Sequence, residues 1–430
     1  MSENAEKLRL SESDNHQKNW KKWGPYLAER QWGTVREDYS ASGNAWEFLT
    51  HDNARSKAYR WGEDGIAGIC DDRQVLCFAV VFWNGKDPIL KERFFGLAGT
   101  EGNHGEDVKE YYFYLDNTPT HSYMKMLYKY PQQEFPYNHL VTENKKRDKS
   151  QPEFELSDTG VFNENRYFDI FIEYAKCDEK DIMIKITAFN CGPEHAELNI
   201  IPQIWFRNTW SWGYDPYKPQ ITLARKNTLS ATHKNLGKYY FYAKGEPATM
   251  FCENETNVGK LYQLKKINGY FKDGFHEYVV NGQQQAINPE NQGTKAGFNY
   301  FLNIPAGKSN TVQLRLTATP NERPFSGFED IFRRRQAEAD DFYTDPQSEV
   351  PGDDAKIIQR QALAGMLWSK QFYYFDIPQW LSGDPAQSTP PAERKIGRNS
   401  GWEHLTNAEI ISMPDKWEYP WYAAWDLAFH

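Results

Sequence analysis

The sequence predicts a β-rich fold in which a large antiparallel β-sandwich is followed by helices. From about residue 60 to residue 320, short runs rich in Val, Ile, Phe and Tyr alternate with Gly, Pro, Asn and Asp, a pattern typical of strands joined by turns. No helical spacer separates these runs, so we expect neighbouring strands to pair in antiparallel fashion. The predicted strands are 75–83, 108–115, 122–130, 166–176, 181–188, 196–206, 238–243, 298–304 and 311–317.

The run 181–188 shows the two-residue period most clearly. Ile182, Ile184 and Ile186 fall on one face of the predicted strand, whereas Lys185 and Thr187 fall on the other. One face is therefore expected to meet the core and the other to meet solvent, as in one layer of a sandwich.

The first thirty residues are polar and charged and are predicted to lead into the sandwich domain, which we assign to 31–325. Trp23 and Leu27 are four residues apart, which favours a short helix from Trp20 to Arg30. This lead-in, 1–30, is expected to be helical.

The periodicity changes at Ser326, where a second domain spanning 326–430 is predicted to begin. Ser326 and Glu329 match a capping box, and the apolar residues that follow lie on one helical face as far as Tyr343. A second helix is predicted from Asp353 to about Tyr374. Residues 376–400 contain four Pro and predict a long loop, and loops of this length in compact domains are usually functional.

Composition excludes several function classes. The formal net charge of −9 argues against nucleic acid as a partner, because phosphate binding needs clustered Lys and Arg. No apolar run approaches the roughly 20 residues of a membrane-spanning helix. The five Cys are scattered without a CxxC pair, and the N-terminus lacks the apolar stretch of a signal peptide, so we expect a cytoplasmic protein. No metal-binding or cofactor-binding motif is present in the sequence, and no cofactor is expected.

The aromatic content points to carbohydrate as the first substrate class to test. Trp, Tyr and Phe make up 16% of the chain, and flat aromatic rings pack against the C–H faces of sugars while their N–H and O–H groups bond hydroxyls. Filling a large β core is the alternative interpretation for most of these residues. Two charged clusters near Trp32 and Trp61, the second containing Glu63 and Asp64, are interpreted as salt-bridged turns or as a loop over a substrate site.

The densest group of residues that could carry chemistry lies between 413 and 430. Glycoside hydrolysis needs one carboxylic acid to protonate the leaving oxygen and a second carboxylate to activate water or attack the sugar. Trp425 precedes Asp426, and an apolar wall of this kind raises a carboxyl pKa, which keeps the acid protonated near neutral pH. In the alternative interpretation Asp426 caps a helix beginning at Leu427. Candidate sugar-contacting residues are Trp417, Glu418, Tyr419, Trp421, Trp425, His404, Asn399 and Trp402.

The run from Trp417 to His430, WEYPWYAAWDLAFH, resembles the general-acid segment of glycoside hydrolase family 63. In that family an aromatic-rich run ends in Trp-Asp, two variable residues and Phe-His. The strings QWGTVREDYS at 31–40 and AYRWGEDG at 58–65 are similar to the bacterial glucosidase and mannosylglycerate hydrolase-like branch. The resemblance thus covers both ends of the chain.

The resemblance implies an N-terminal β-sandwich and an (α/α)₆ six-hairpin barrel that cleaves terminal α-linked glucose or mannose with inversion. Asp426 matches the family's general acid. The family's general base is a Glu several hundred residues further on, and no residue of this chain corresponds to it. We therefore expect the 430 residues to contain only the first helices of the barrel and to be inactive by themselves. The aromatic-rich stretch that runs to His430 fits a chain that stops within the domain.

Two other functions remain open at this stage. One is a non-catalytic β-sandwich protein that holds glycans on an aromatic-rich face. The other is a different (α/α)₆ glycosidase, of the trehalase-like or glucoamylase-like kind, which shares the chemistry and differs in the shape of its sugar subsites. The sugar, the linkage and the oligomeric state are not predicted.

Overall fold

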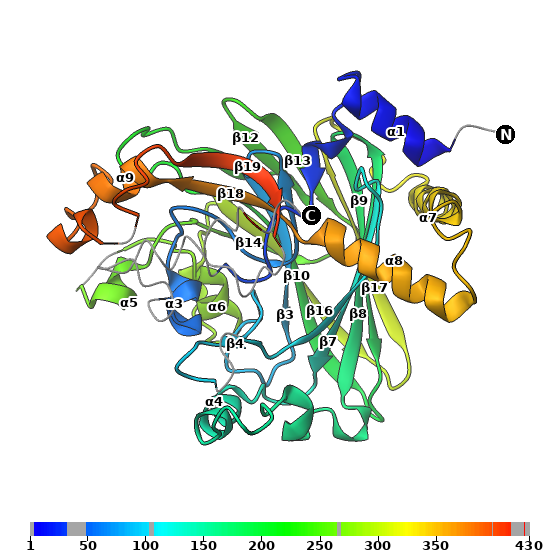
Figure 1. Cartoon of the computed structure of the whole chain (residues 1–430), viewed down its shortest axis with the longest axis horizontal. Helices are drawn as coiled ribbons and strands as arrows, with labels where there is room; N and C mark the ends of the chain where they lie inside the picture. The colour runs from blue at the N-terminus through cyan, green and yellow to red at the C-terminus, as the bar shows by residue number, and fades with distance from the viewer. Residues whose placement is uncertain are drawn as a thin grey trace.

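The computed structural model describes residues 4–31, 49–102, 107–264, 268–397, 399–413 and 425. Within these residues the strands form two large antiparallel sheets packed face to face (Figure 1). The six-stranded sheet has the order β1 (Trp23–Gly24), β2 (Ile66–Asp71), β3 (Leu76–Trp83), β10 (Ala196–Phe206), β16 (Lys295–Ile304), β14 (Ala248–Cys252). The nine-stranded sheet has the order β15 (Gln292–Gly293), β11 (Gln220–Arg225), β12 (Thr228–His233), β13 (Gly237–Ala243), β17 (Ser309–Thr317), β9 (Asp181–Asn190), β8 (Tyr167–Asp178), β7 (Tyr123–Pro131), β6 (Tyr111–Asn117).

Helices and two small hairpins surround the sandwich. The strand pairs are β4 (Gly96–Leu97) with β5 (Asp107–Val108), and β18 (Lys370–Asp376) with β19 (Thr406–Ser412). The α-helices are α1 (Ala5–Asp14), α3 (His51–Ser56), α4 (Tyr137–Lys145), α5 (Val258–Tyr262), α6 (Gly274–Val279), α7 (Phe328–Thr344), α8 (Asp353–Trp368) and α9 (Ile377–Ser382). Short 3₁₀ turns are Trp20–Lys22, Leu156–Thr159, Asn163–Asn165, Gln284–Ala286 and Ala392–Lys395.

The core lies between the two sheets and confirms the predicted antiparallel sandwich. Ile182, Ile184 and Ile186 of β9 are buried there, while Lys185 and Thr187 lie on the outer face of the nine-stranded sheet. The predicted strand 196–206 coincides with β10, and the other predicted runs each overlap a strand of one of the two sheets. Strands β2, β11, β12 and β14 were not among the predicted runs.

The predicted helix from Trp20 to Arg30 is wrong. A 3₁₀ turn at Trp20–Lys22 leads into β1, and Pro25, which lacks an N–H and restricts the residue before it, follows directly. The N-terminal helix is α1, where the Asn4 side chain accepts hydrogen bonds from two backbone N–H groups of the first turn. Buried Glu6 anchors it by accepting from the Thr120 N–H at 2.7 Å.

The helices after residue 326 differ from the prediction in their ends. Helix α7 begins at Phe328 after Gly327, which has a positive φ of 67°, and no side chain caps it; the Glu329 carboxylate instead accepts from Gln313 Nε2. Helix α8 ends at Trp368 rather than near Tyr374, because the aromatic run that follows favours a strand. The predicted loop 376–400 contains the short helix α9.

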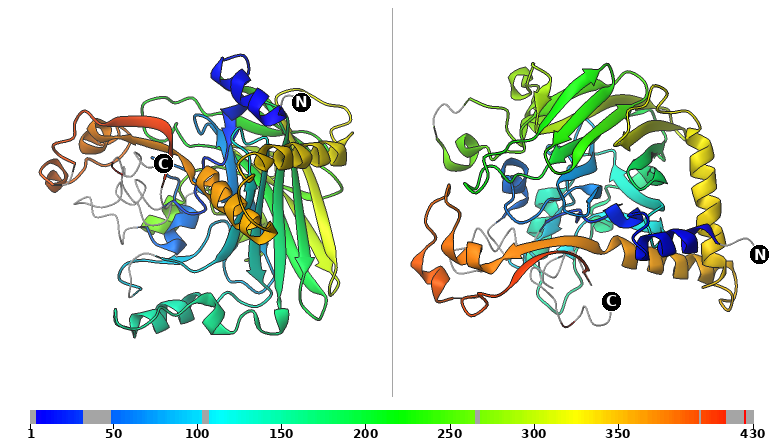
Figure 2. Two further views of the ribbon diagram at one scale, coloured as in Figure 1. Left: turned by 45° about the vertical axis from the view of Figure 1, so that its right-hand side comes forward. Right: turned by 90° about the horizontal axis from the view of Figure 1, so that it is seen from above.

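Helices α7 and α8 pack on the nine-stranded sheet. Phe328 and Phe332 of α7 meet the outward side chains of Tyr123 and Met183, whereas Trp368 of α8 stacks on Tyr114 with ring centroids 5.1 Å apart. Two further views show α7 lying against the sandwich (Figure 2). In the described residues the chain continues from α8 into the β18–β19 hairpin, so the (α/α)₆ barrel and the domain division at 325/326 stay predictions.

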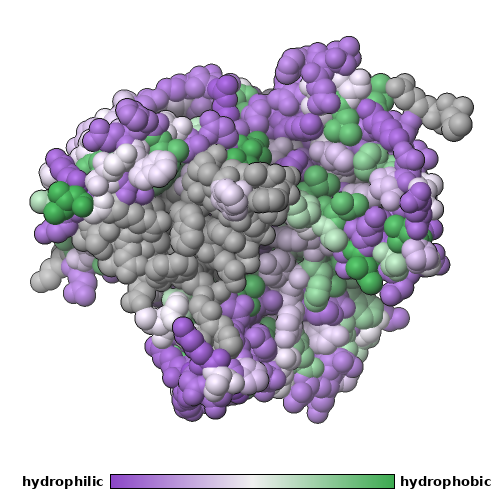
Figure 3. All heavy atoms as spheres, viewed as in Figure 1, coloured by the Kyte–Doolittle hydropathy of each residue, from purple (hydrophilic) through white to green (hydrophobic). Residues whose placement is uncertain are grey.

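Helix α8 also exposes an apolar strip. Ile357, Ile358, Leu363 and Met366 are exposed on it, and hydrophobic side chains gather at this position in the space-filling view (Figure 3). The buried residues of the helix are Ala364 and Trp368. The docking of α8 therefore rests on a few side chains of its sheet-facing side.

Replacing Trp368 by Ala should lower the free energy of unfolding by about 3–5 kcal/mol, because the indole is fully buried and its Nε1 donates to the Asp116 carbonyl at 3.1 Å. The matched control is Met366→Ala on the same helix, where the exposed side chain makes the expected cost about 0.5 kcal/mol or less. Urea unfolding monitored by circular dichroism measures both. Equal costs for the two variants would contradict the docking of α8.

Candidate functional site

The structure describes a part of the predicted catalytic segment. Asp426, Trp417, Glu418, Tyr419 and Trp421 lie outside the described residues. Their roles and mutual distances therefore stay predictions.

Four of the predicted sugar-contacting residues are described. Trp425 is 80% exposed, and Trp402 is 65% exposed in the segment that leads into β19. Asn399 has a positive φ of 66°, and its carbonyl accepts from the Trp402 N–H at 2.9 Å, which closes a turn before the exposed His404. The structure thus brings Asn399, Trp402 and His404 together on one turn, with the ring of Trp402 open to solvent.

The loop before this turn is fixed to the sandwich through Arg60. The Arg60 guanidinium donates from Nε to both oxygens of Asp384, at 3.1 and 3.0 Å, and lies 4.2 Å from the ring centre of Trp61. Burial opposes the charge, but Asp384 holds the pKa of Arg60 above its ordinary value. Gly213 allows close approach, because a Cβ there would lie 2.7 Å from the Ala386 nitrogen.

The strongest concentration of perturbed charges in the described chain lies on the outer face of the six-stranded sheet. A cavity of about 10 Å³ is lined there by three acids and three bases, together with Gln203, Trp205 and Asn254. The six ionisable residues are Glu63, Asp64, Glu92, Arg93, Lys272 and Lys295. We call these nine residues the buried charge cluster.

Each acid of the buried charge cluster has a polar partner. Lys295 Nζ donates to Glu92 Oε1 at 2.8 Å, and Arg93 Nε donates to Asp64 at 3.3 Å. Asn254 Nδ2 donates to Glu63 Oε1 at 2.9 Å. The Glu63–Asp64 pair noted in the sequence is therefore buried, with Asp64 in an ion pair as the salt-bridge interpretation expected.

Burial shifts the pKa values of this cluster in opposite directions. It raises the pKa of Glu63, with the nearby Lys272 opposing the shift, and it lowers the pKa of Lys272 to about 8. For Glu92 burial would also raise the pKa, but the charges of Lys295 and Arg93 outweigh it and hold the pKa at about 2. Glu92 is thus held in its ionised form, whereas burial favours the neutral forms of Glu63 and Lys272.

The geometry of the cluster fits a water molecule rather than a substrate. Glu92 Oε2, Gln203 Oε1 and Asn254 Oδ1 are buried without a hydrogen-bond partner. A cavity of about 10–15 Å³ with two or more polar partners is enough for one water and far below the roughly 300 Å³ of small-ligand sites. We interpret the cluster as an internal support for the face on which the Arg60 loop lies.

A second group of acids surrounds a lysine near β5. Carboxylate oxygens of Asp107, Glu153 and Glu155 lie within 4.8 Å of one another, a spacing that could hold a metal ion. Lys109 Nζ already contacts all three, at 2.6 Å from Glu153 and 2.9 Å from Glu155. Burial and the neighbouring Glu153 carboxyl group raise the pKa of Asp107 to about 7. The Lys109 ammonium group thus supplies the positive charge that these three carboxylates need.

Comparison with known proteins finds a relative by sequence and weak likeness to solved structures. No family model matches the chain. It is 44% identical over 474 aligned residues to the Saccharomyces cerevisiae protein YMR196W, described as uncharacterized, and the alignment covers 99% of this chain and 44% of the relative. The chain thus spans less than half the length of that relative.

Among solved structures, a putative kojibiose phosphorylase from the human microbiome is similar with a TM-score of 0.24 and 8% identity, over 76% of this chain and 36% of that one. A likeness of this size carries no argument about activity, and the resemblance to family 63 rests on the sequence alone. In the described ranges, no helix has both the length and the apolarity needed to cross a membrane.

Glu92→Gln should lower the free energy of unfolding by about 3–5 kcal/mol at pH 6, because Lys295 is left buried without its counter-charge. Folded Glu92 has its pKa depressed from 4.5 to about 2, so its contribution is complete above pH 4.5 and is lost as the pH falls toward 2. The difference in the free energy of unfolding between wild type and Glu92→Gln should therefore be smaller at pH 3.5 than at pH 6. Urea unfolding at the two pH values measures it.

The control is Glu349→Gln, which removes an exposed carboxylate and should shift stability by about 0.5 kcal/mol or less at both pH values. If the difference in the free energy of unfolding between wild type and Glu92→Gln is the same at pH 6 and pH 3.5, Glu92 is not ionised in the folded protein.

Proposed function

We propose that this chain supplies the sandwich and the general acid of an inverting α-glycosidase that acts on terminal α-linked glucose or mannose. The observation that carries the proposal is the sequence Trp425-Asp426-x-x-Phe429-His430 at the end of an aromatic-rich run. The antiparallel sandwich that precedes it is compatible with the architecture implied by the resemblance.

In this proposal Asp426 donates the proton to the glycosidic oxygen as the bond breaks. In the complete protein, apolar surroundings of Asp426 are proposed to disfavour the carboxylate and to keep the acid protonated near neutral pH. An inverting enzyme needs a second carboxylate about 6.5–9.5 Å away to activate water on the opposite face of the sugar. That base is proposed to be a Glu beyond residue 430, so the 430 residues alone are expected to bind sugar without turning it over.

The proposed sugar contacts come from two segments. Trp417, Tyr419 and Trp421 supply stacking surfaces, and Glu418 supplies an acceptor for sugar hydroxyls. Asn399, Trp402 and His404 lie on one turn, where the exposed indole of Trp402 offers a further stacking face. The backbone hydrogen bond from Trp402 to Asn399 that closes this turn supports the proposal, because a substrate contact needs a positioned side chain.

The test uses the complete product of the gene that encodes this chain, with and without Asp426→Asn. Removing a general acid should lower kcat for an α-linked disaccharide by about 10²–10⁴-fold while leaving sugar binding nearly unchanged. A nitrophenyl α-glycoside, whose leaving group needs little protonation, should lose much less activity. Release of glucose or mannose from the two substrate types measures the difference.

The control variant is Glu349→Gln, which should retain wild-type rates on both substrates because Glu349 is an exposed residue before α8. If Asp426→Asn hydrolyses the disaccharide at the wild-type rate, the assignment of the acid is wrong. An equal loss on both substrates would indicate a structural effect and also contradict the role as proton donor.

A further inference from the structure

The outer face of the nine-stranded sheet is divided by α7 into a covered and an uncovered part. Tyr123, Ala175 and Met183 lie under α7. Two residues away along each strand, on the same face, the pairing register places a row of side chains across the sheet: Lys125, Glu173, Lys185 and Gln313. This row lies at the foot of α7, because Gln313 Nε2 donates to Glu329 and Glu173 accepts from Gln336, at 2.9 and 3.0 Å.

A second row, farther from α7, carries two aromatic side chains, and Lys125 Nζ lies 5.1 Å from the ring centre of one of them, Phe171. Pairing places Phe113, Leu127, Phe171, Thr187 and Thr311 side by side on β6, β7, β8, β9 and β17. We call these five residues the outer row. Phe113 is 42% exposed, and strands spaced about 4.8 Å apart give the row a length of roughly 19 Å.

Two hollows follow these rows and share residues. One, of about 370 Å³, is lined by Phe171, Thr187 and residues at the foot of α7, including Lys125 and Glu329. The other, of about 680 Å³, lies at the edge of the sandwich, where the chain leaves β13 and enters β14. Thr311 and Gln313 line both hollows. We call the two hollows together the sheet groove.

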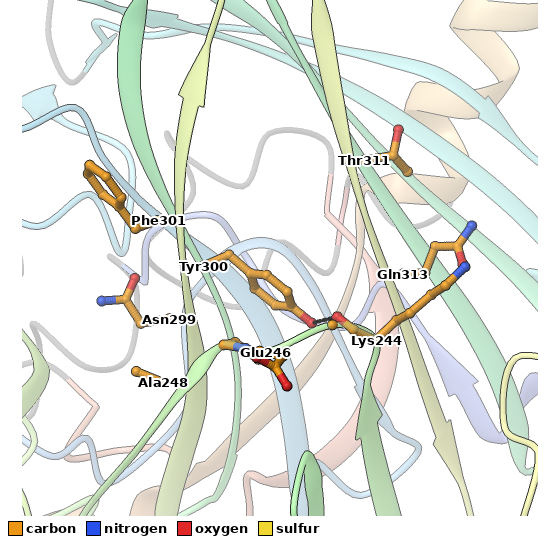
Figure 4. A pocket seen from close by; sticks show the side chains of 10 residues that line it. Lys244, Glu246, Ala248, Asn299, Tyr300, Phe301, Thr311 and Gln313 are labelled. Atoms are coloured by element: carbon orange, nitrogen blue, oxygen red, sulfur yellow. Dashed lines mark hydrogen bonds between the residues drawn. The ribbon is translucent and has the colours of Figure 1, made fainter.

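The edge of the sheet groove is held rigid by neighbouring hydrogen bonds. Tyr300 Oη donates to the Lys244 carbonyl at 2.8 Å, and Lys244 Nζ donates to Gln313 Oε1 at 2.6 Å. In Figure 4, Tyr300 lies between Asn299 and Phe301 on one side and Lys244 and Gln313 on the other. The side chains that line the edge are thus positioned before any ligand arrives, which lowers the entropic cost of binding.

The charges of the sheet groove balance. Three lysines, Lys125, Lys185 and Lys244, face three glutamates, Glu173, Glu246 and Glu329. Lys185 lies 3.4 Å from Glu173, and Lys226 outside the groove pairs with Glu246 at 2.6 Å. A balanced lining gives no attraction to a polyanion or to a strongly charged peptide. It suits a neutral ligand that offers many hydroxyls.

We propose that the sheet groove binds an extended neutral oligosaccharide across the strands without cleaving it. The phenyl ring of Phe171 in the groove, and that of Phe113 farther along the outer row, stack on the C–H faces of sugar rings. Thr187, Thr311 and the neighbouring charged side chains bond the hydroxyls. This site uses none of the residues proposed for hydrolysis and goes beyond that function. It retains a glycan on the protein.

The test measures binding of maltohexaose, cellohexaose and mannohexaose to this chain by isothermal titration calorimetry. Phe171→Thr and Phe113→Thr keep residues that favour strands and should each weaken binding of the preferred hexasaccharide at least tenfold. Tyr262→Ala, which removes an exposed ring from α5, should bind as wild type does. Unchanged unfolding midpoints of the Phe variants exclude a folding defect.

The outcome separates this proposal from the proposed hydrolysis. Asp426→Asn should bind the hexasaccharide as wild type does, whether or not it hydrolyses disaccharides. The proposal is overturned if none of the three hexasaccharides binds, or if the two Phe variants bind as tightly as wild type. Binding of heparin that disappears at 0.5 M salt, with no hexasaccharide binding, would overturn it as well and indicate a polyanion site.

Discussion

Burial of both faces of the six-stranded sheet is the constraint on which the rest of the structure depends. The inner face packs on the nine-stranded sheet, and every residue of β2 is buried. The outer face is covered by loops and by the β18–β19 hairpin, whose Phe372 packs near Trp205. Charged side chains that lie beneath this cover need partners, because burying an unpaired charge costs several kcal/mol of folding free energy. Pairs such as Glu92–Lys295, 203 residues apart, therefore fix where the covering segments lie.

The sequence predicted strands whose apolar and polar residues alternate, and it missed strands without that alternation. Strand β9 has one face in the core and one toward solvent, so its period of two is visible. Strand β2, IAGICD, is buried on both faces and contains two small residues, so neither alternation nor bulk marks it. The predicted helix from Asp353 to about Tyr374 included the first residues of β18, but this segment pairs with β19. The strand preference of its aromatic residues and the pairing with β19 act in the same direction.

The candidate sites likewise divide into those that the sequence shows directly and those that only the fold brings together. A motif such as Trp425-Asp426 is contiguous, so the sequence displays it without any knowledge of the fold. The buried charge cluster joins residues from distant segments, and the Glu63–Asp64 pair was visible in the sequence while Arg93, Lys272 and Lys295 were not connected with it. The outer row needs the register of four strand pairings, which no single-sequence pattern contains. The only available signal was the excess of aromatic residues.

The two outer faces of the sandwich impose a geometric condition on any shared substrate. The β18–β19 hairpin covers the six-stranded sheet, whereas the hollow lined by Phe171 lies on the other sheet. The core between the sheets is about 10 Å thick, so a short glycan cannot occupy both faces. A long one would have to pass the sandwich edge, where Thr311 of one sheet and Phe301 of the other line a single hollow (Figure 4). Contact with both faces therefore depends on the length of the glycan.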